Sequence, residues 1–416
     1  MTGKAMRIII AGGGIGGLTA ALCLHELGHT VIVLESAAEI RPLGVGINLL
    51  PHAGRILTAL GLLPALEAQA VVTRELVYFN SHGQRIWGEP RGHYAGHAAP
   101  QLSLHRGHLQ MTLLEAVRAR LGTSSVLTGH RVTAFSQDSS GVVIECATQA
   151  GGPTRFEGDL LIAADGIHSS IRAHYQPDEG PPAYSGRMLW RGVSLAQPFL
   201  TGASMIMSGH QNQKFVAYPI RPVQADGRQL INWIAELPVK ELAQREDWNK
   251  PGDLGAFLPA FEDWCFDWLD VPGLIRSAEA VFEFPMVDRD TLSRWSHGRV
   301  TLLGDAAHPM YPIGSNGASQ AILDADALVR ALTSASGPAP AQTALSTYEA
   351  ERLPATAVIV RANRGNGPEQ CMQLAHERAP QGFSRIEDVF APGELETISK
   401  SYQALTGLRA QEAAKP

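Results

Sequence analysis

The chain has 416 residues, of which 45% are hydrophobic and 18% charged, and its formal net charge is −6. This composition is typical of a folded globular protein and excludes a fibrous or largely disordered one. Lys and Arg are scattered rather than gathered in runs, so no nucleic-acid partner is expected. At this length we expect two domains with separate cores.

The cysteines and the apolar runs suggest where the protein resides. The four cysteines form no CxxC pair, so we expect no zinc site or disulfide framework but buried thiols in a reducing compartment. The run Ile8–Ala11 is too short for a signal peptide, and no stretch reaches the roughly 18 apolar residues of a membrane span. We therefore expect a cytoplasmic protein without a membrane partner.

The first predicted unit is a strand, a turn, a helix and a second strand. Arg7–Ala11 is a continuous apolar run, typical of a strand buried in a parallel sheet. The GxGxxG motif Gly12–Gly17 follows, then helical spacing over Leu18–Leu27 and a strand over Thr30–Leu34. The strand ends at Glu35, which can accept hydrogen bonds from both ribose hydroxyls. This order predicts dinucleotide binding, but it does not distinguish FAD from NAD.

A second acid closes a strand in the middle of the chain. The apolar run Asp159–Ala164 ends at Asp165, which Gly166 follows. Ligands of doubly wound sheets bind at the carboxyl ends of strands, which makes Asp165 a candidate. The alternative is an Asp-Gly turn without a function.

A third acid, Asp305, follows the predicted strand Arg299–Leu303. The glycine-spaced segment Pro312–Ser319 then opens a helix over Gln320–Leu332. Asp305 is placed to accept sugar or ribityl hydroxyls, and the helix N-terminus can stabilise an anion in the same cleft. For the neighbouring His308 we expect a structural hydrogen bond.

Two inserts, residues 72–100 and 181–280, are rich in strand-like runs, which are Glu75–Asn80, Met188–Val193, Lys214–Pro219 and Gln229–Glu236. A further apolar group has helical spacing and predicts core packing; it comprises Phe261, Trp264, Cys265, Trp268 and Leu269. His93 and His97 lie in a glycine-rich loop, so we predict no metal. From about Thr347 helix signals continue, interrupted at Pro354, to a tail that is expected to fray.

Together, the three motifs in this order resemble those of the class A flavoprotein aromatic hydroxylases. The resemblance extends over the whole chain and is strongest to the phenazine-pathway members. The stretches that carry it are Arg41–Asn48, Glu89–Gly92, His105–Gly107, Pro285–Asp290 and Gly304–Ala325.

The resemblance implies an α/β fold in which a discontinuous Rossmann-like FAD-binding domain (1–71, 101–180 and 281–370) is joined by a sheet-rich substrate domain (72–100 and 181–280). A helical tail (371–416) follows. The implied FAD-binding residues are Gly12, Gly14, Ile15, Gly16, Gly17, Glu35, Ser36, Gly46, Arg106, Gln110, Val132, Asp165, Gly304, Asp305, Pro312, Gly317 and Ala318. Arg106 would reach the pyrophosphate or ribityl region. The alternative is a surface arginine before a helix over Leu109–Leu121.

The implied reaction is the hydroxylation of an aromatic or N-heteroaromatic small molecule, with or without decarboxylation. It would consume O2 and NADH or NADPH and pass through a flavin C4a-hydroperoxide. Candidate substrate contacts are Trp190, Arg191, Tyr218 and Tyr311, with Tyr218 as the catalytic candidate. Each of these could instead be a packed core side chain.

Two other functions stay open on the sequence. One is a flavin oxidase or dehydrogenase that inserts no oxygen, and the other is a non-catalytic flavin redox sensor. The sequence does not decide between a monomer and a homodimer, nor between NADH and NADPH, and it leaves the ring position open.

Overall fold

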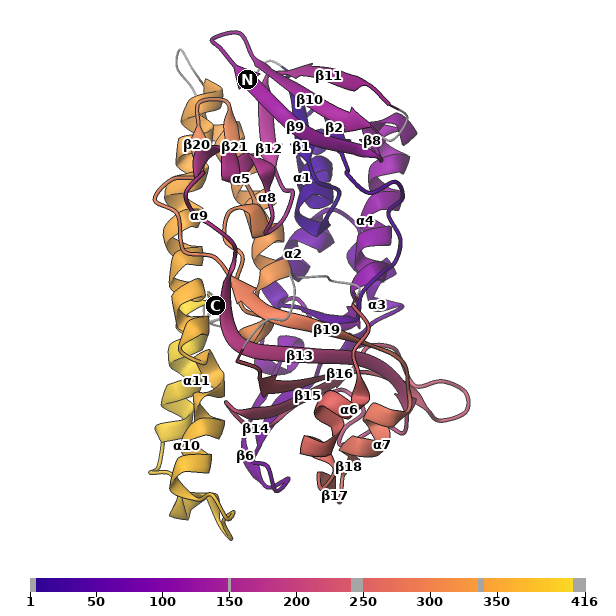
Figure 1. Ribbon diagram of the computed structural model, residues 1–416, viewed down its shortest axis with the longest axis vertical. Coiled ribbons are helices and arrows are strands. Elements are labelled where there is room, and N and C mark those ends of the chain that lie inside the picture. The colour runs from indigo at the N-terminus through magenta and orange to yellow at the C-terminus, as the bar shows by residue number, and fades with distance from the viewer. Residues whose placement is uncertain (1–4, 149–150, 241–249, 336–339, 407–416) are drawn as a thin grey trace, which may run out of the picture.

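The computed structural model describes residues 5–148, 151–240, 250–335 and 340–406. In Figure 1 a parallel sheet with its helices lies at the top, a larger sheet crosses below it, and helix α9 (Pro340–Arg364) runs along the side of both. The end of the predicted tail, residues 407–416, lies outside the described residues. Within the described part of the chain, no helix has both the length and the apolar character needed to cross a membrane.

The upper sheet has six strands in the order β20-β21-β12-β1-β2-β8, and all neighbours are parallel except β20 and β21. Its strands are β1 (Arg7–Ala11), β2 (Thr30–Leu34), β8 (Val126–Leu127), β12 (Leu160–Ala163), β20 (Ser296–His297) and β21 (Val300–Leu302). The apolar runs that predicted β1, β2, β12 and β21 are buried because helices cover the sheet. Their carboxyl ends therefore lie at one edge, where the three predicted acids stand.

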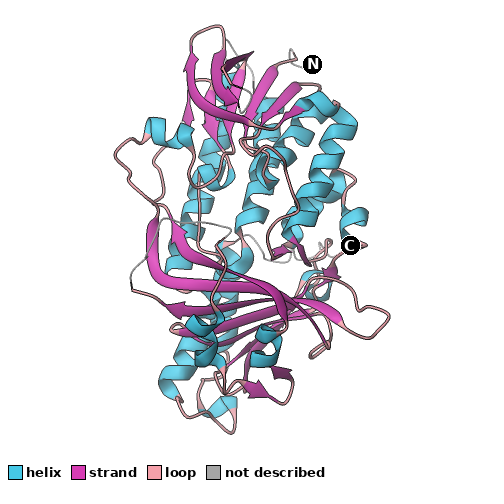
Figure 2. Cartoon of the chain, turned by 45° about the vertical axis from the view of Figure 1, so that its right-hand side comes forward, coloured by secondary structure: helices cyan, strands magenta, loops and turns pink. Residues whose placement is uncertain are grey.

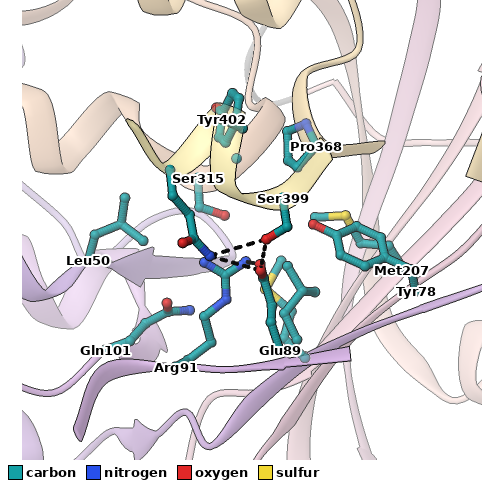
Figure 3. Close-up of a pocket in the computed structure, with 14 residues that line it drawn as sticks. Leu50, Tyr78, Glu89, Arg91, Gln101, Met207, Ser315, Pro368, Ser399 and Tyr402 are labelled. Carbon is teal, nitrogen blue, oxygen red and sulfur yellow. Dashed lines mark hydrogen bonds and ion pairs between the residues drawn. The ribbon is translucent and has the colours of Figure 1, made fainter. Parts of the chain in front are cut away.

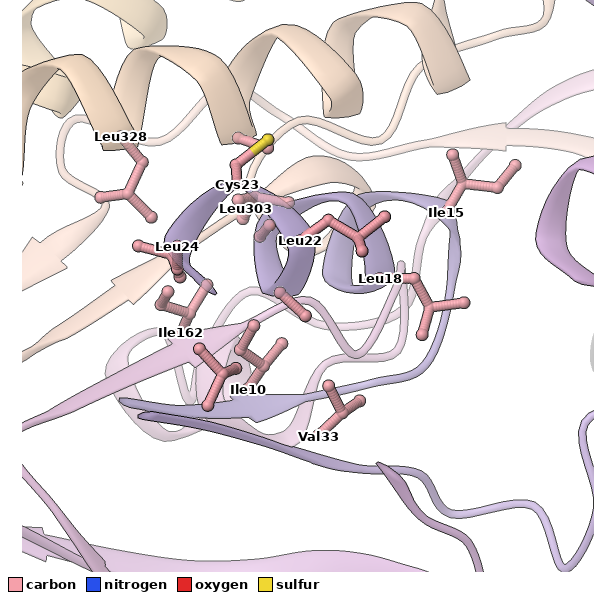
Figure 4. Close-up of a cluster of buried hydrophobic side chains, with 14 of the residues drawn as sticks. Ile10, Ile15, Leu18, Leu22, Cys23, Leu24, Val33, Ile162, Leu303 and Leu328 are labelled. Carbon is pink, nitrogen blue, oxygen red and sulfur yellow. The ribbon is translucent and has the colours of Figure 1, made fainter. Parts of the chain in front are cut away.

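Helix α1 (Ile15–Glu26) fills the centre of this domain. Leu18 and Leu22 pack on the strands below it, where Ile10 and Val33 lie, and Leu328 of α8 (Gly317–Ser334) closes the other side (Figure 4). The surrounding helices are α2 (Pro51–Ala59), α3 (Leu63–Glu67), α4 (Arg106–Leu121) and α5 (Ser170–Tyr175). Two three-stranded sheets flank them: β3 (Gly46–Leu49), β7 (Leu102–His105) and β4 (Val71–Val72), and β9 (His130–Gln137), β10 (Val142–Thr148) and β11 (Pro153–Gly158).

The lower sheet has seven strands in the order β19-β13-β16-β15-β14-β5-β6 (Figure 2). They are β5 (Glu75–Phe79), β6 (Arg85–Pro90), β13 (Ala183–Ala196), β14 (Ser204–His210), β15 (Gln213–Pro219), β16 (Gln229–Pro238) and β19 (Ala278–Asp288). One face packs on α6 (Leu254–Phe257) and α7 (Val271–Arg276), and the other on α10 (Gln370–Arg378) and α11 (Glu394–Leu405). Because β19 runs to Asp288, the sheet extends past the predicted boundary at residue 280.

Two local features differ from the form that the sequence indicated. Phe261, Trp264 and Leu269 are buried in the core, as predicted, but the segment is not helical: a 3-10 turn ends at Phe261, and the short strands β17 (Cys265–Phe266) and β18 (Leu269–Asp270) follow. Helix α9 continues through Pro354, because its packing on α8 compensates for the backbone hydrogen bond that proline cannot make. In addition, Cys265 is exposed, whereas the other three cysteines are buried as expected.

Candidate active site

The glycine-rich turn between β1 and α1 forms an open cradle. A Cβ on Gly12 would lie 2.2 Å from the Ala164 carbonyl oxygen, and one on Gly17 would lie 2.1 Å from the Gly12 carbonyl oxygen. The protein itself therefore requires glycine at these two positions. Gly14, at the N-cap of α1, has no protein atom within 4 Å of its would-be Cβ, and no side chain caps the helix. This uncapped helix N-terminus with free space in front of it fits a pyrophosphate.

The side chains of Glu35 and Gln110 flank this cradle. Glu35 Oε2 accepts a hydrogen bond from the Gly13 N–H (2.8 Å), and its Oε1 accepts from Ala37 N–H (2.7 Å). Gln110 donates from Nε2 to the Gly13 carbonyl (2.8 Å) and accepts from Arg106 Nη1 (2.8 Å). Two of the predicted cofactor residues therefore contact the turn directly, and Arg106 is connected to it through Gln110.

Arg106 is the first residue of α4 and is partly buried, so it is not a free surface arginine. Burial lowers the pKa of its guanidinium, and the carboxylates of Asp305 and Glu35 oppose that shift. Arg106 thus lies within electrostatic range of two of the predicted cofactor acids. A cation between them fits a phosphate or ribityl contact.

Asp165 stands next to the Gly12 turn at the end of β12. Its Oδ2 accepts a hydrogen bond from Ser170 N–H (3.0 Å), while Oδ1 is buried without a protein partner, and burial raises the pKa of the carboxyl. The Ser170 hydroxyl also contacts the Val132 carbonyl (3.4 Å). An unpaired buried acceptor is costly, so Oδ1 fits a hydroxyl donor supplied by a cofactor.

The N-terminus of α8 faces the same cleft as Asp305. The Asp305 side chain is exposed to water in the cleft. The protein packed around it still desolvates its carboxyl and raises the pKa. Asn316, at the N-cap, does not cap the helix but donates from Nδ2 to Tyr402 Oη of α11 (2.9 Å). No protein atom lies within 4 Å of a Cβ built on Gly317. The free N–H groups of this helix end fit the polar edge of a flavin ring.

Asp324 of α8 fixes the turn that carries Asp305. Its Oδ2 accepts from Gly304 N–H (3.0 Å) and lies 2.6 Å from His308 Nε2, and its Oδ1 accepts from Arg352 Nε (2.7 Å). Burial raises the pKa of Asp324, but His308 and Arg352 outweigh this effect and lower the pKa to about 2. The hydrogen bond expected of His308 is therefore present.

We expect Asp324→Asn to destabilise the protein by about 2 to 3 kcal/mol at pH 7, as measured by urea unfolding, because the fold holds this carboxylate charged. The depressed pKa contributes stability above the unfolded pKa near 3.8 and loses it as the pH falls toward 2. The difference between the two proteins should therefore begin to shrink below about pH 4. The control is Asp326→Asn on the same helix: this side chain is partly exposed and pairs with the half-exposed Arg330, so its loss should change stability little. A difference that is independent of pH would contradict the assignment.

Arg172, which the sequence analysis did not single out, fixes the same turn from the opposite side. It is 1% exposed and donates from Nη1 to the carbonyls of Ala306 (3.1 Å) and Ala307 (2.9 Å). It also pairs with Glu179 and donates to the Asp290 carbonyl (2.9 Å). The signal in the sequence that could have identified Arg172 is its position seven residues after Asp165.

Arg191 and Tyr218 lie on the face of the lower sheet that meets the cofactor cleft. Burial lowers the pKa of Arg191 and raises the pKa of Tyr218, and the proximity of the two groups opposes both shifts. Arg191 Nη2 donates to the Gly46 carbonyl (2.8 Å), and Asn232 Oδ1 accepts from the Gly46 N–H (2.7 Å). A Cβ on Gly46 would lie 2.5 Å from Asn232, so the lower sheet itself demands glycine there.

The other two substrate candidates have different surroundings. Trp190 stacks on Phe257 on the opposite face of the sheet, with ring centroids 4.9 Å apart, so the expectation that it faces the pocket is wrong. Because adjacent residues of a strand point to opposite faces of the sheet, Trp190 cannot lie on the face that Arg191 occupies. Tyr311 lies near the ion pair of Arg364 and Asp288 and does not line the pocket described next.

A small pocket lies between the lower sheet and the C-terminal helices (Figure 3), and neither Arg191 nor Tyr218 is among its lining residues. It begins beside Leu50 and the Gly314–Ser315 turn, which precede α2 and α8. The sheet side of its wall comprises Leu76, Tyr78, Glu89, Arg91, Gln101, Met205 and Met207, and the helical side comprises Pro368, Ser399, Tyr402 and Gln403. It therefore lies between the predicted cofactor turns and the lower sheet.

Comparison with known proteins agrees with this geometry. The family model described as the FAD binding domain matches residues 5–363. Over 411 residues the chain is 48% identical to the phenazine 1,6-dicarboxylic acid hydroxylase PhzS of Lysobacter antibioticus, covering 97% of this chain and 98% of that one. It is 34% identical over 400 residues to the 3-amino-4-hydroxybenzoate 2-monooxygenase PtmB3 of Streptomyces platensis, covering 92% and 94%.

The fold is also found among solved structures. Klebsiella pneumoniae HpxO, in complex with FAD and uric acid, matches with a TM-score of 0.72 at 24% identity, covering 98% of this chain and 94% of that one. The 2,6-dihydroxypyridine-3-hydroxylase of Arthrobacter nicotinovorans matches with a TM-score of 0.70 at 24% identity, covering 94% and 95%.

The cradle, the three acids and the two uncapped helix ends thus fit a flavoprotein that binds its flavin as a dinucleotide. The chain belongs to the FAD binding domain family. Within it, the chain is a FAD-dependent monooxygenase of the aromatic hydroxylase type, as its sequence predicted.

Proposed function

We propose that this monooxygenase hydroxylates a planar N-heteroaromatic small molecule at the face of the lower sheet that carries Arg191 and Tyr218, consuming O2 and NADH or NADPH. The observation that carries the proposal is the buried Arg191–Tyr218 pair, which contacts the Gly46 backbone where the cofactor cleft meets the lower sheet. The phenazine substrate named for the relative of 48% identity supports the ring class. Loss of a carboxyl group during hydroxylation is part of the same hypothesis.

Bound FAD supplies electron transfer from the nicotinamide and activation of oxygen. The chain's part is to bind and to orient. The Gly12–Gly17 turn would hold the pyrophosphate, Glu35 the ribose, and Asp165 and Asp305 the hydroxyls of the linking chain. The uncapped end of α8 would face the flavin. The remaining predicted cofactor contacts, among them Ile15, Gly16, Ser36, Pro312 and Ala318, are proposed on the family resemblance.

Tyr218 is proposed as a hydrogen-bond donor to the substrate. Arg191 can only donate, so a contact between the two would use the Tyr218 oxygen as acceptor and leave the phenolic proton for the substrate. Burial raises the pKa of Tyr218, which keeps that proton in place at neutral pH. The lower sheet and the C-terminal helices would exclude water from the reacting ring.

Three further assignments belong to the proposal. The first assignment is the division into a FAD-binding part (1–71, 101–180 and 281–370), a substrate part and a helical tail. In this division the substrate part extends to Asp288. A cytoplasmic location is another, which the unpaired state of all four cysteines supports. The third is a monomer or homodimer.

The test uses the purified protein with its bound flavin. We expect a yellow protein whose NADH or NADPH oxidation accelerates when a phenazine is added, and whose product contains one atom of isotope-labelled O2. Consumption without labelled product would indicate an oxidase, and consumption unaffected by any aromatic compound would indicate a redox sensor. Either outcome would overturn the proposed reaction.

For Tyr218→Phe we expect unchanged FAD content but a decrease in product formation of about 10-fold or more, because one positioned proton donor is lost. Product per NAD(P)H consumed, measured by chromatography, is the decisive quantity. Tyr184→Phe is the matched control: this tyrosine lies in β13 and donates to the Val239 carbonyl (2.8 Å), away from the cleft. Equal product yields from the two variants would contradict the role of Tyr218.

A further inference from the structure

Arg221 is a cation without an acid partner. It lies in the turn after β15, where it is partly buried, and its carbonyl accepts from Nε2 of the buried Gln229 (3.0 Å). Its guanidinium donates to His108 Nε2 of α4. Within the described part of the chain it pairs with no carboxylate, whereas Arg228 of the same turn pairs with Asp226 (2.8 Å). The charge of Arg221 is therefore available to an anion from outside the protein.

Two imidazoles at the start of α4 hold this guanidinium in place. Arginine can only donate, so His108 Nε2 is the acceptor and the proton of that ring lies on Nδ1. The His105 ring packs edge-on against the His108 ring, with centroids 5.4 Å apart, and its Nδ1 accepts from the Gly107 N–H (3.1 Å). Burial and the charge of Arg221 lower the pKa of His108, so its ring is neutral at pH 7. The two rings therefore position the charge of Arg221 without neutralising it.

The positive charge continues from Arg221 toward the cofactor cleft. Burial lowers the pKa of His105, and the charges of Arg221 and Arg106 lower it further. Burial also lowers the pKa of Arg106, and the charge of Arg191 adds to this effect. His105 is paired with Gly46 in the ladder of β7 and β3, and Gly46 is the residue whose carbonyl accepts from Arg191. A positive potential therefore extends from the turn at Arg221 to the cleft, and it attracts an anionic ligand along this path.

The contact between Arg221 and His108 lies apart from the cradle proposed for the FAD diphosphate. Arg106 and Gln110, four residues apart, share the side of α4 that reaches Gly13. His108 follows Arg106 by two residues, which places it about 200° around the helix axis. Arg221 therefore meets α4 on another side of the helix, where it can serve a second diphosphate.

We propose that Arg221, oriented by His108, binds the diphosphate of the NADH or NADPH that the enzyme consumes. The sequence contains a single GxGxxG motif, Gly12–Gly17, and the proposed function assigns it to FAD, so the nicotinamide dinucleotide needs other donors. Arginine suits this task because its parallel N–H donors match two phosphate oxygens. The partly exposed side chain leaves the donors that do not face His108 accessible from solvent. The inference rests on the placement of FAD in the proposed function, but not on the class of aromatic substrate.

The experiment follows flavin reduction in the anaerobic holoenzyme at increasing concentrations of NADH and of NADPH, which separates the Kd of the nicotinamide from the limiting rate. For Arg221→Met we expect the Kd to rise about 10-fold, the effect of one lost charge-assisted hydrogen bond. The limiting rate should stay within about 2-fold of the wild type, because the diphosphate takes no part in the transfer of electrons. Arg221→Lys keeps a point charge without the fork of donors, so its Kd should lie between those of the wild type and Arg221→Met.

Arg228→Met is the matched control, because this exposed arginine of the same turn already pairs with Asp226, and its loss should leave the Kd unchanged. The ratio of flavin to protein absorbance should be the same in all variants. Loss of FAD from Arg221→Met would assign the arginine to the FAD site and overturn the proposal, and so would an unchanged Kd for the nicotinamide. Either result leaves the proposed hydroxylation intact. That reaction fails instead if no aromatic compound accelerates NADH or NADPH consumption by the wild type.

Discussion

Gly14→Ala is expected to weaken FAD binding by about 10- to 100-fold and to leave the apoprotein folded. The new methyl group meets no protein atom, and the backbone at this position (φ −76°) accepts alanine. It enters the space reserved for the pyrophosphate, where overpacking costs about 1 to 3 kcal/mol. The Kd for FAD, measured by quenching of flavin fluorescence in the reconstituted apoprotein, checks the result.

The matched comparison is Gly17→Ala, three residues along the same motif. Its Cβ would overlap the Gly12 carbonyl oxygen, so we expect lost stability in addition to lost FAD. Urea unfolding of the two apoproteins separates the cases: Gly14→Ala should stay within about 1 kcal/mol of the wild type. A Gly14→Ala protein that binds FAD like the wild type would show that the pyrophosphate lies elsewhere.

Arg172→Met is expected to cost about 3 to 5 kcal/mol of unfolding free energy, because it leaves three buried backbone carbonyls without their donor, while Glu179 keeps Arg289 as its partner. The purified variant should also lose FAD, since the Asp305 turn is released on one side. Chemical denaturation measures the first effect and the flavin-to-protein absorbance ratio the second.

Arg155→Met provides the control for Arg172→Met. This arginine also pairs with a glutamate, but its side chain is 65% exposed, and removal should change stability by about 0.5 kcal/mol or less. If the two variants unfold alike, Arg172 does not support the turn as described.

The sequence predicted the cofactor half of the molecule well because its signals are local. Each strand is a continuous apolar run, each is followed at once by its glycines or its acid, and the strand ends of a parallel sheet meet at one edge. The family resemblance supplied the choice of FAD, which the spacing of Gly12–Gly17 alone could not make.

The substrate half was less accessible because its contacts join distant segments. Asn232 reaches Gly46 across 186 residues, and Ser399 reaches Glu89 across 310. The lower sheet is buried on both faces, so alternation along β13 gave no sign of which face holds Arg191 and which holds Trp190. The spacing over 261–269 fitted a helix, yet tertiary packing produced turns and short strands instead.

The bond between Tyr402 and Asn316 ties the cofactor turn to α11, the last helix in the described part of the chain. Gly314 and Tyr402 are so close that a Cβ on the glycine would lie 2.1 Å from the phenolic oxygen. During translation, a nascent polypeptide that ends before α11 has its glycine motif and its upper sheet but lacks this support. The flavin end of the cleft can therefore take its final form only after α11 has been synthesised and has packed against this turn.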